Sequence, residues 1–341
     1  MSLAFRSGRA ATPLAVAVML HLVASATGAQ EPTTRTANGE VISLPSAIAE
    51  FEAGRYAEAA ASFRSLHEAT PGNATTMMYL GRLALLRGDD DTAAEWLERA
   101  VRADGDVAEH HHWLGRARAQ EAIHAGLFRR VRLAGAIKSA FERAVQLDPR
   151  DIEARLDLLR FYVAAPGIVG GSVRAAKEQA DAVARLDAMW GHIARGIVAE
   201  KEDDLARAER EYRAALVSHQ DRAAPYYALG AMYQRAGRFG DAYGIYERLR
   251  AARPDETAVL YQIGRTASVS GERLEAGARA LERYLGMPTV EGTPLPASAQ
   301  YRLGLILERQ GRFADARRAL EQAARLEPER DDVREALKRL P

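Results

Sequence analysis

The densest group of metal-ligand side chains is the run of three histidines at 110–112, followed by His124. Imidazole nitrogens bind zinc, and Glu109 or Glu121 would add an oxygen ligand. Consecutive helical residues point about 100° apart, so three adjacent rings cannot converge on one ion. His112 would reach His124 only if the intervening segment folds back. We therefore interpret the run as a solvated histidine cluster and expect no metal site.

A second candidate for chemistry is the glycine-rich stretch 167–172, which reads GIVGGS. Glycine-rich turns before helices cradle phosphate through backbone N–H groups. Here no strand precedes the stretch and no Lys-Ser/Thr pair follows it, as phosphate loops require. We favour a structural role, in which Pro166 ends one helix, Gly170 and Gly171 turn the chain, and Ser172 caps the next helix.

No set of side chains has a spacing that argues for catalysis: there is no suitable carboxylate pair, Ser/His/Asp set or Cys/His set. We therefore expect a protein that is not an enzyme and needs no cofactor. The 47 basic and 46 acidic residues nearly cancel, which argues against a nucleic-acid partner. The absence of cysteine excludes disulfides and thiolate metal sites.

The elements that carry these residues follow the pattern of Ala223–Glu256. With Ala223 as position 1, the residues at positions 4, 7, 8, 11, 15, 17, 20, 24, 27 and 32 are Tyr226, Leu229, Gly230, Tyr233, Gly237, Phe239, Ala242, Tyr246, Leu249 and Pro254. Gly230 and Ala242 are small, so two helix backbones can approach where they cross. Gly237 allows the turn between them, and Pro254 ends the second helix.

This spacing resembles the tetratricopeptide repeat, which has two antiparallel helices per unit. About eight units with the same small and large positions lie between residues 40 and 330. The resemblance implies an all-α, right-handed α-solenoid of helical hairpins, because one hairpin cannot bury its own apolar face. Residues 331–341 are charged and amphipathic, and we predict that they form a helix that caps the end of the array.

The array is interrupted near residues 119–136, 165–171 and 289–296. The third unit is stretched by ten residues, so we expect longer helices or a protruding element there. The segments FRRVRLAGAIKSAFERAVQLDP and LRFYVAAPGIVGGS resemble a group of uncharacterised secreted bacterial tetratricopeptide proteins. The specific part of that resemblance is Glu121 to Ser172, and it implies a shared architecture and no reaction.

Residues 1–29 have the features of a secretory signal peptide: Arg6 and Arg9, an apolar run from Leu14 to Val23, and small residues at 24–26. The apolar run is about half the roughly 20 residues that a membrane span needs, so a retained anchor is the less favoured alternative. Residues 30–39 are predicted to be a flexible lead-in. We therefore expect a periplasmic or secreted bacterial protein without a membrane span in its mature chain.

In a tetratricopeptide superhelix the first helix of each unit lines a concave groove, with positions 5 and 9 pointing into it. Across units two to eight, position 5 is Met78, His112, Leu156, Ile193, Tyr227, Tyr261 and Tyr301, and position 9 is Arg82, Arg116, Arg160, Ile197, Ala231, Arg265 and Leu305. The polar and aromatic members, with Met78, predict a partner-binding groove that is basic toward the N-terminus and aromatic toward the C-terminus. The alternative is that the arginines belong to a common repeat pattern and merely pack.

The leading hypothesis is a non-enzymatic scaffold that binds a protein or peptide in this groove; an acidic peptide or a free C-terminus would suit the arginines. A saccharide that stacks on the tyrosines is a weaker candidate. A second hypothesis is a structural accessory of cell-envelope or exopolysaccharide assembly that docks through residues 127–130 of the third unit. A metal-dependent hydrolase that uses residues 110–124 is a third and remote one.

Overall fold

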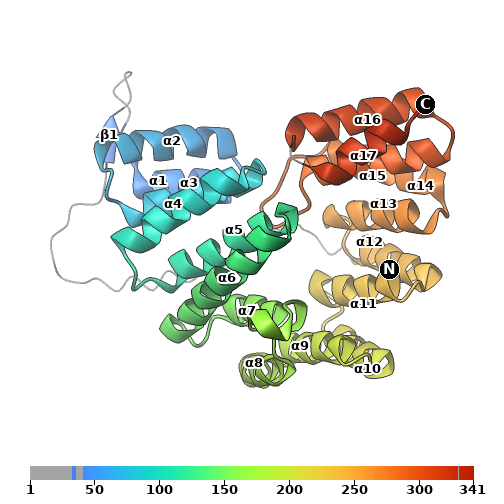
Figure 1. The fold of residues 1–341 in the computed structure, drawn as a ribbon, viewed down its shortest axis with the longest axis horizontal. Helices are drawn as coiled ribbons and strands as arrows, with labels where there is room; N and C mark the ends of the chain where they lie inside the picture. The colour runs from blue at the N-terminus through green and yellow to red at the C-terminus, as the bar shows by residue number, and fades with distance from the viewer. Residues whose placement is uncertain (1–32, 36–40, 329) are drawn as a thin grey trace, which may run out of the picture. The chain divides into compact units, whose positions relative to one another are not determined.

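The computed structural model describes residues 33–35, 41–328 and 330–341, all within one compact unit, Pro32–Pro341. The predicted signal peptide lies outside these residues. The described chain is a helical solenoid of eight hairpins (Figure 1). The first helices are α1 Leu44–Glu52, α3 Ala74–Leu86, α5 Ala108–His124, α7 Ile152–Ala164, α9 Ala188–Lys201, α11 Ala223–Arg235, α13 Ala258–Ser270 and α15 Pro296–Arg309. The second helices are α2 Tyr56–Ala69, α4 Asp90–Ala103, α6 Leu127–Leu147, α8 Val173–Leu186, α10 Leu205–Ser218, α12 Phe239–Ala252, α14 Leu274–Leu285 and α16 Phe313–Leu326.

The close approach of the two helices in each hairpin depends on a glycine in the first helix. A Cβ atom at Gly230 of α11 would lie 2.5 Å from Cε1 of the Tyr246 ring in α12. Tyr246 is fully buried, so the ring fills the space that the missing side chain leaves. The predicted role of the small residue at position 8 is confirmed, and the same contact recurs between Gly196 and Tyr212.

The turn within the hairpin needs a left-handed residue at position 15. Gly237 has a φ of +71° there, as predicted. In the fifth hairpin the same position is Asp203, with a φ of +61°. Aspartate tolerates this conformation better than most residues, so the turn forms without glycine.

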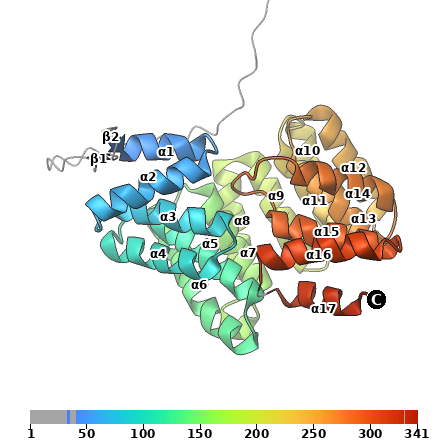
Figure 2. The ribbon, with the colours of Figure 1, turned by 90° about the horizontal axis from the view of Figure 1, so that it is seen from above.

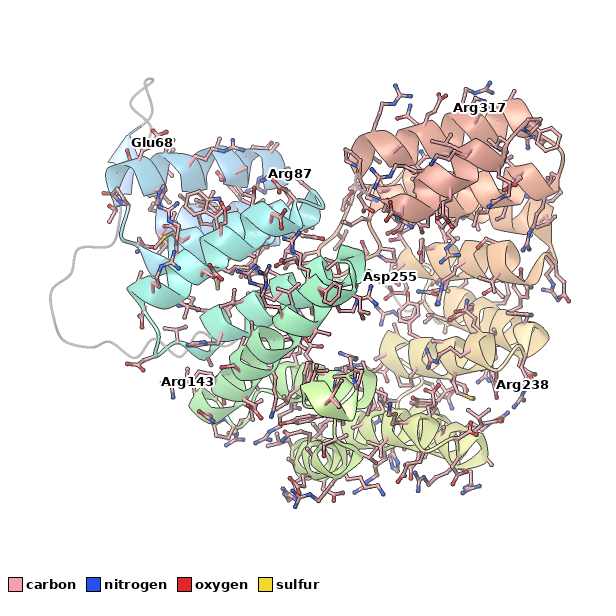
Figure 3. All side chains as sticks on the ribbon, in the orientation of Figure 1. Glu68, Arg87, Arg143, Arg238, Asp255 and Arg317 are labelled. Carbon is pink, nitrogen blue, oxygen red and sulfur yellow. The ribbon has the colours of Figure 1, made fainter. Side chains whose placement is uncertain are left out.

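The helices that pack closely are neighbours or next neighbours in the chain, as expected for a solenoid. The buried side chains accordingly form three clusters along the chain, which together run from Ala47 to Leu340. At the C-terminal end α17, Asp331–Arg339, packs on α16 with Val333 and Ala336 buried (Figure 2). Charged side chains such as Arg143 and Arg317 cover the second helices (Figure 3).

The N-terminal segment contains a short antiparallel ribbon, which the sequence pattern does not predict. Strand β1, Thr33–Arg35, pairs with β2, Val41–Ser43. The first strand falls in the segment predicted to be a flexible lead-in, and the rest of that segment lies outside the described residues. The Ser43 side chain accepts a hydrogen bond from the Ser46 backbone and begins α1 directly after β2.

The irregular third and fourth hairpins differ from the others in helix length and in their turns. Helix α6 has 21 residues where most second helices have 14, and α5 has 17. A 3₁₀ turn, η1 Gly167–Val169, joins α7 to α8, with a φ of +102° at Gly170. Ser172 accepts a hydrogen bond from the Ala175 N–H and caps α8, which confirms its predicted structural role.

Among the described helices, none is both long enough and apolar enough to cross a membrane.

Candidate functional site: the arginine cluster of the first helices

Arg82, in α3, is more enclosed than the predicted groove arginines Arg116 and Arg160. Its guanidinium carbon lies 4.6 Å from the ring centroid of Phe51, 4.6 Å from that of Tyr79 and 4.5 Å from that of Trp113. Each ring face attracts the cation by about 0.5–2 kcal/mol, more where water is excluded. The three rings come from α1, α3 and α5, so the stacking of the first hairpins builds this cage.

The open side of the cage is occupied by Glu291, which belongs to the connector between α14 and α15. Arg82 donates two hydrogen bonds to this carboxylate, from Nε at 3.0 Å and from Nη2 at 2.6 Å. The Glu291 backbone N–H also donates to the Tyr56 hydroxyl, at 3.0 Å. Burial alone would lower the pKa of Arg82, but the hydrogen bond and charge of Glu291 outweigh it and raise that pKa. Two segments 209 residues apart in the chain are thereby joined.

A second contact lies beside this one, at the turn between α3 and α4. A Cβ atom at Gly88 would lie 3.5 Å from both Leu295 of the connector and Glu327 after α16. Burial, followed by the negative charge of Glu327, raises the pKa of Asp90 to about 7. Asp90 is therefore partly protonated at neutral pH, which weakens the repulsion between these carboxyl groups.

The next two groove arginines converge on Asp157 of α7. Arg116 donates from Nε at 2.7 Å, Arg160 donates from Nη1 at 2.8 Å, and His112 donates from Nε2 at 2.9 Å. Burial by itself raises the pKa of Asp157, but the hydrogen bond from His112 and the charges of the two arginines lower it well below its usual range. Asp157 is therefore ionised at neutral pH and ties the third hairpin to the fourth.

The three adjacent histidines diverge, as their helical spacing predicts, but the prediction that they form a solvated cluster is wrong, because the rings of His110 and His112 are buried. Nδ1–H of His110 donates to the Asp104 carbonyl and Nε2–H of His111 donates to the Gly105 carbonyl, both at 2.9 Å, while His112 points to Asp157. The side chain of His124 lies outside the described residues. In the part of the chain that the structure describes, no group of three or more histidine, aspartate or glutamate residues is arranged to hold a metal ion.

The predicted aromatic residues of the C-terminal half are mostly engaged between hairpins. The Tyr227 hydroxyl donates to Glu256 at 2.8 Å, and Arg265 donates to Gln234 at 2.8 Å. Tyr261 is only 8% exposed. Tyr301 packs under the Arg330 guanidinium, whose carbon lies 4.8 Å from the ring centroid. These side chains stabilise the stack and offer little area to a partner.

The nine predicted groove residues differ in exposure. Met78, His112 and Tyr261 are buried, whereas Tyr227, Arg265 and Tyr301 are half-buried. Among the arginines, the side chains are exposed to very different degrees: 12% for Arg82, 33% for Arg116 and 52% for Arg160. The surface that remains open to a partner is therefore centred on Arg116 and Arg160.

Several residues around these arginines carry no groove signal in the sequence, among them Trp113, Asp157 and Glu291. Trp113 and Asp157 directly follow position 5, at a place in the repeat that is not a groove position. Glu291 lies in a connector whose period is broken, so no repeat position marks it. An acidic residue in a proline-rich interruption of a regular array is the only signal that the sequence offers for it.

Stacked helical hairpins without a closed sheet, in the residues that the structure describes, define a helical solenoid. Residues 44–108 and 261–336 match the family model described as tetratricopeptide repeat. These two segments are therefore tetratricopeptide repeats, as their spacing indicates. Repeats of this family in general bind proteins or peptides. None of the curated proteins matches the chain.

Solved structures similar to the chain include a tetratricopeptide repeat protein from Parabacteroides merdae, 12% identical, with a TM-score of 0.49 over 86% of this chain and 96% of that one. The Cut9–Hcn1 hetero-tetramer of the APC/C is 14% identical, with a TM-score of 0.45 over 87% of this chain and 54% of that one. MamA is 20% identical, with a TM-score of 0.40 over 52% of this chain and 96% of that one.

Proposed function

We propose that this protein is a non-enzymatic scaffold, periplasmic or secreted, that binds a protein or peptide partner through the first helices of its hairpins. The match of two segments to a repeat family that in general binds proteins or peptides supports the class of function. The signal-like features of residues 1–29 support the location. Cell fractionation with a periplasmic marker tests that location, and a wholly cytoplasmic protein would contradict it.

The observation that carries the proposal is the row of arginines on α3, α5 and α7. Arg116 and Arg160 share one carboxylate, that of Asp157, and both keep part of the guanidinium exposed. Arg116 also contacts the exposed carboxylate of Glu153, through Nη2 at 3.4 Å, so an incoming carboxylate would compete with Glu153 for this guanidinium. Arginine forks bind carboxylates through two parallel hydrogen bonds. An acidic peptide or a free C-terminal carboxylate is the partner chemistry that this surface fits.

We expect the double substitution Arg116→Gln with Arg160→Gln to weaken binding of an envelope partner by about tenfold or more, because each lost charged contact removes about 1–3 kcal/mol. The partner is recovered by crosslinking and pulldown from envelope extract and identified by mass spectrometry. The matched control is Arg174→Gln with Arg318→Gln, two exposed arginines of second helices. Equal recovery by both double variants would refute the assignment of this surface.

A second candidate function, a structural accessory of envelope or exopolysaccharide assembly, rests on the apolar tip formed by Leu127 and Phe128. Their side chains, at the start of the lengthened α6, are 70% and 91% exposed. Exposed aromatic and aliphatic side chains at one tip are typical of docking surfaces.

For this candidate we expect Leu127→Ser with Phe128→Ser to abolish association with an envelope complex while the helical content stays unchanged. Co-purification from solubilised envelope, with circular dichroism of the variant, measures both. Val217→Ser, at a position 74% exposed on α10, is the control. If the double variant co-purifies as well as the control, the tip does not dock.

A further inference from the structure

The connector Met287–Leu295 contacts the Arg82 cage in the way that a bound peptide would. It supplies one carboxylate to the guanidinium and one backbone N–H to the Tyr56 hydroxyl. A side-chain anchor combined with a backbone hydrogen bond to a fixed side chain recognises an extended acidic peptide. Nothing in hairpin packing requires this contact, since the other closely packed helices are near neighbours in the chain.

We propose that the Arg82 cage is a binding site for an extended peptide that contains glutamate, and that Glu291 of the connector occupies it as an intramolecular ligand. This inference rests on the proposed function and names the partner chemistry and the regulation of its N-terminal end. A partner with the same chemistry binds by displacing the connector. The remaining surface of Arg116 and Arg160 stays open to that partner throughout.

The cage selects a carboxylate because the aromatic rings fix the position of the Arg82 guanidinium. Three ring faces surround the guanidinium, so its N–H groups are directed to the open side. The side chain is 12% exposed, and Glu109 on α5 provides a second, longer contact at 3.4 Å. A neutral glutamine would keep one hydrogen bond but lose the charge, and a charge-assisted bond is roughly twice as strong as a neutral one.

The connector competes strongly because it is tethered. An intramolecular ligand on a short segment has an effective concentration on the order of 1 mM. A free peptide with an intrinsic Kd of about 100 μM is then weakened by about tenfold in the presence of the connector. Removing the negative charge of the connector should therefore let a free peptide bind the cage more tightly.

The probe is a fluorescent, end-blocked synthetic peptide with the sequence of residues 287–295, MPTVEGTPL, together with a copy that has glutamine in place of glutamate. Fluorescence anisotropy with the full chain is expected to show about fivefold tighter binding of the glutamate peptide to the Glu291→Gln variant than to the wild type, because a glutamine connector still competes weakly. On that variant the glutamine peptide should bind about tenfold more weakly than the glutamate peptide. Adding Arg82→Gln to the variant should remove the difference between the peptides.

Glu275→Gln is the matched control, because Glu275 is an exposed glutamate paired with Arg279 on α14, away from the cage. It should bind the peptide as the wild type does. Equal binding to wild type and Glu291→Gln, or equal binding of both peptides to Glu291→Gln, would overturn the inference. Hydrogen exchange of residues 287–295 gives an independent readout: it should rise in Glu291→Gln and not in Glu275→Gln.

The two proposals fail separately. If Arg116 and Arg160 are needed to capture an envelope partner but the peptide does not bind Glu291→Gln, only the inference about the cage is wrong. If the peptide binds Glu291→Gln but no captured partner depends on Arg116 and Arg160, the proposed scaffold surface is wrong and the cage remains a carboxylate site.

Discussion

Gly171→Ala is expected to destabilise the fourth hairpin by about 3 kcal/mol or more. A Cβ atom at this position would lie 1.8 Å from the Ala165 carbonyl oxygen and 2.7 Å from the Ala165 carbonyl carbon. These are backbone atoms, so no side chain can rotate away to relieve the clash. The turn would have to open, which breaks the hydrogen bonds from the Gly171 N–H to the Pro166 carbonyl and from the Ser172 N–H to the Tyr162 carbonyl.

The measurement is urea unfolding followed by circular dichroism, with hydrogen exchange resolving α7 and α8, because a solenoid can lose stability locally. Gly167→Ala is the matched control, since a Cβ atom there meets nothing within 4 Å in the same turn. We expect that variant to unfold within about 1 kcal/mol of the wild type. If the two alanine variants unfold alike, the turn is more adaptable than its geometry indicates.

Arg82→Met is expected to cost about 1–3 kcal/mol and to release the connector. A methionine keeps part of the apolar contact with Phe51, Tyr79 and Trp113 but removes the cation from all three ring faces. It also leaves Glu291, whose side chain is 24% exposed, without its strongest partner. Breaking a buried pair costs about 3–5 kcal/mol, and the partial exposure of this pair lowers the expected figure.

Hydrogen exchange should show faster exchange at both ends of this contact, in the connector and in α1–α3, and urea unfolding should give the total loss. Arg102→Met is the control, because it removes the same charge from an exposed pair with Glu98. Exposed pairs of this kind contribute about 0.3–0.5 kcal/mol. A loss no greater than that of the control would mean that the closed connector does not stabilise the fold.

The hairpins themselves were predictable, because their determinants are local. Gly230 and Gly237 lie within one period of the residues that they contact or turn, so a single unit contains the reason for its own fold. The same holds for Ser172, whose cap involves a backbone group three residues away. The spacing of residues is enough to predict a structural feature when the residues that form it lie in the same repeat.

The candidate site was less predictable, because its contacts cross between repeats. The spacing predicts His112 as a groove residue, but its ring donates a hydrogen bond to Asp157 of the next hairpin, and the pattern of one repeat contains no information about a partner in another. The role of Glu291 is still harder to predict, since its partner Arg82 lies 209 residues away in the chain. The break in the repeat period at 289–296 does not indicate which hairpin the connector contacts. The sequence therefore predicts which arginines lie on the first helices more readily than it predicts how exposed their side chains are.

The link between Arg82 and Glu291 also bears on the order of folding. Contacts between neighbouring helices form early, since closing short loops costs little conformational entropy. The pairing across 209 residues must wait until the connector exists. Until then the aromatic cage has no connector to fill it, so a partner present while the chain folds meets the N-terminal hairpins before the protein's own connector does.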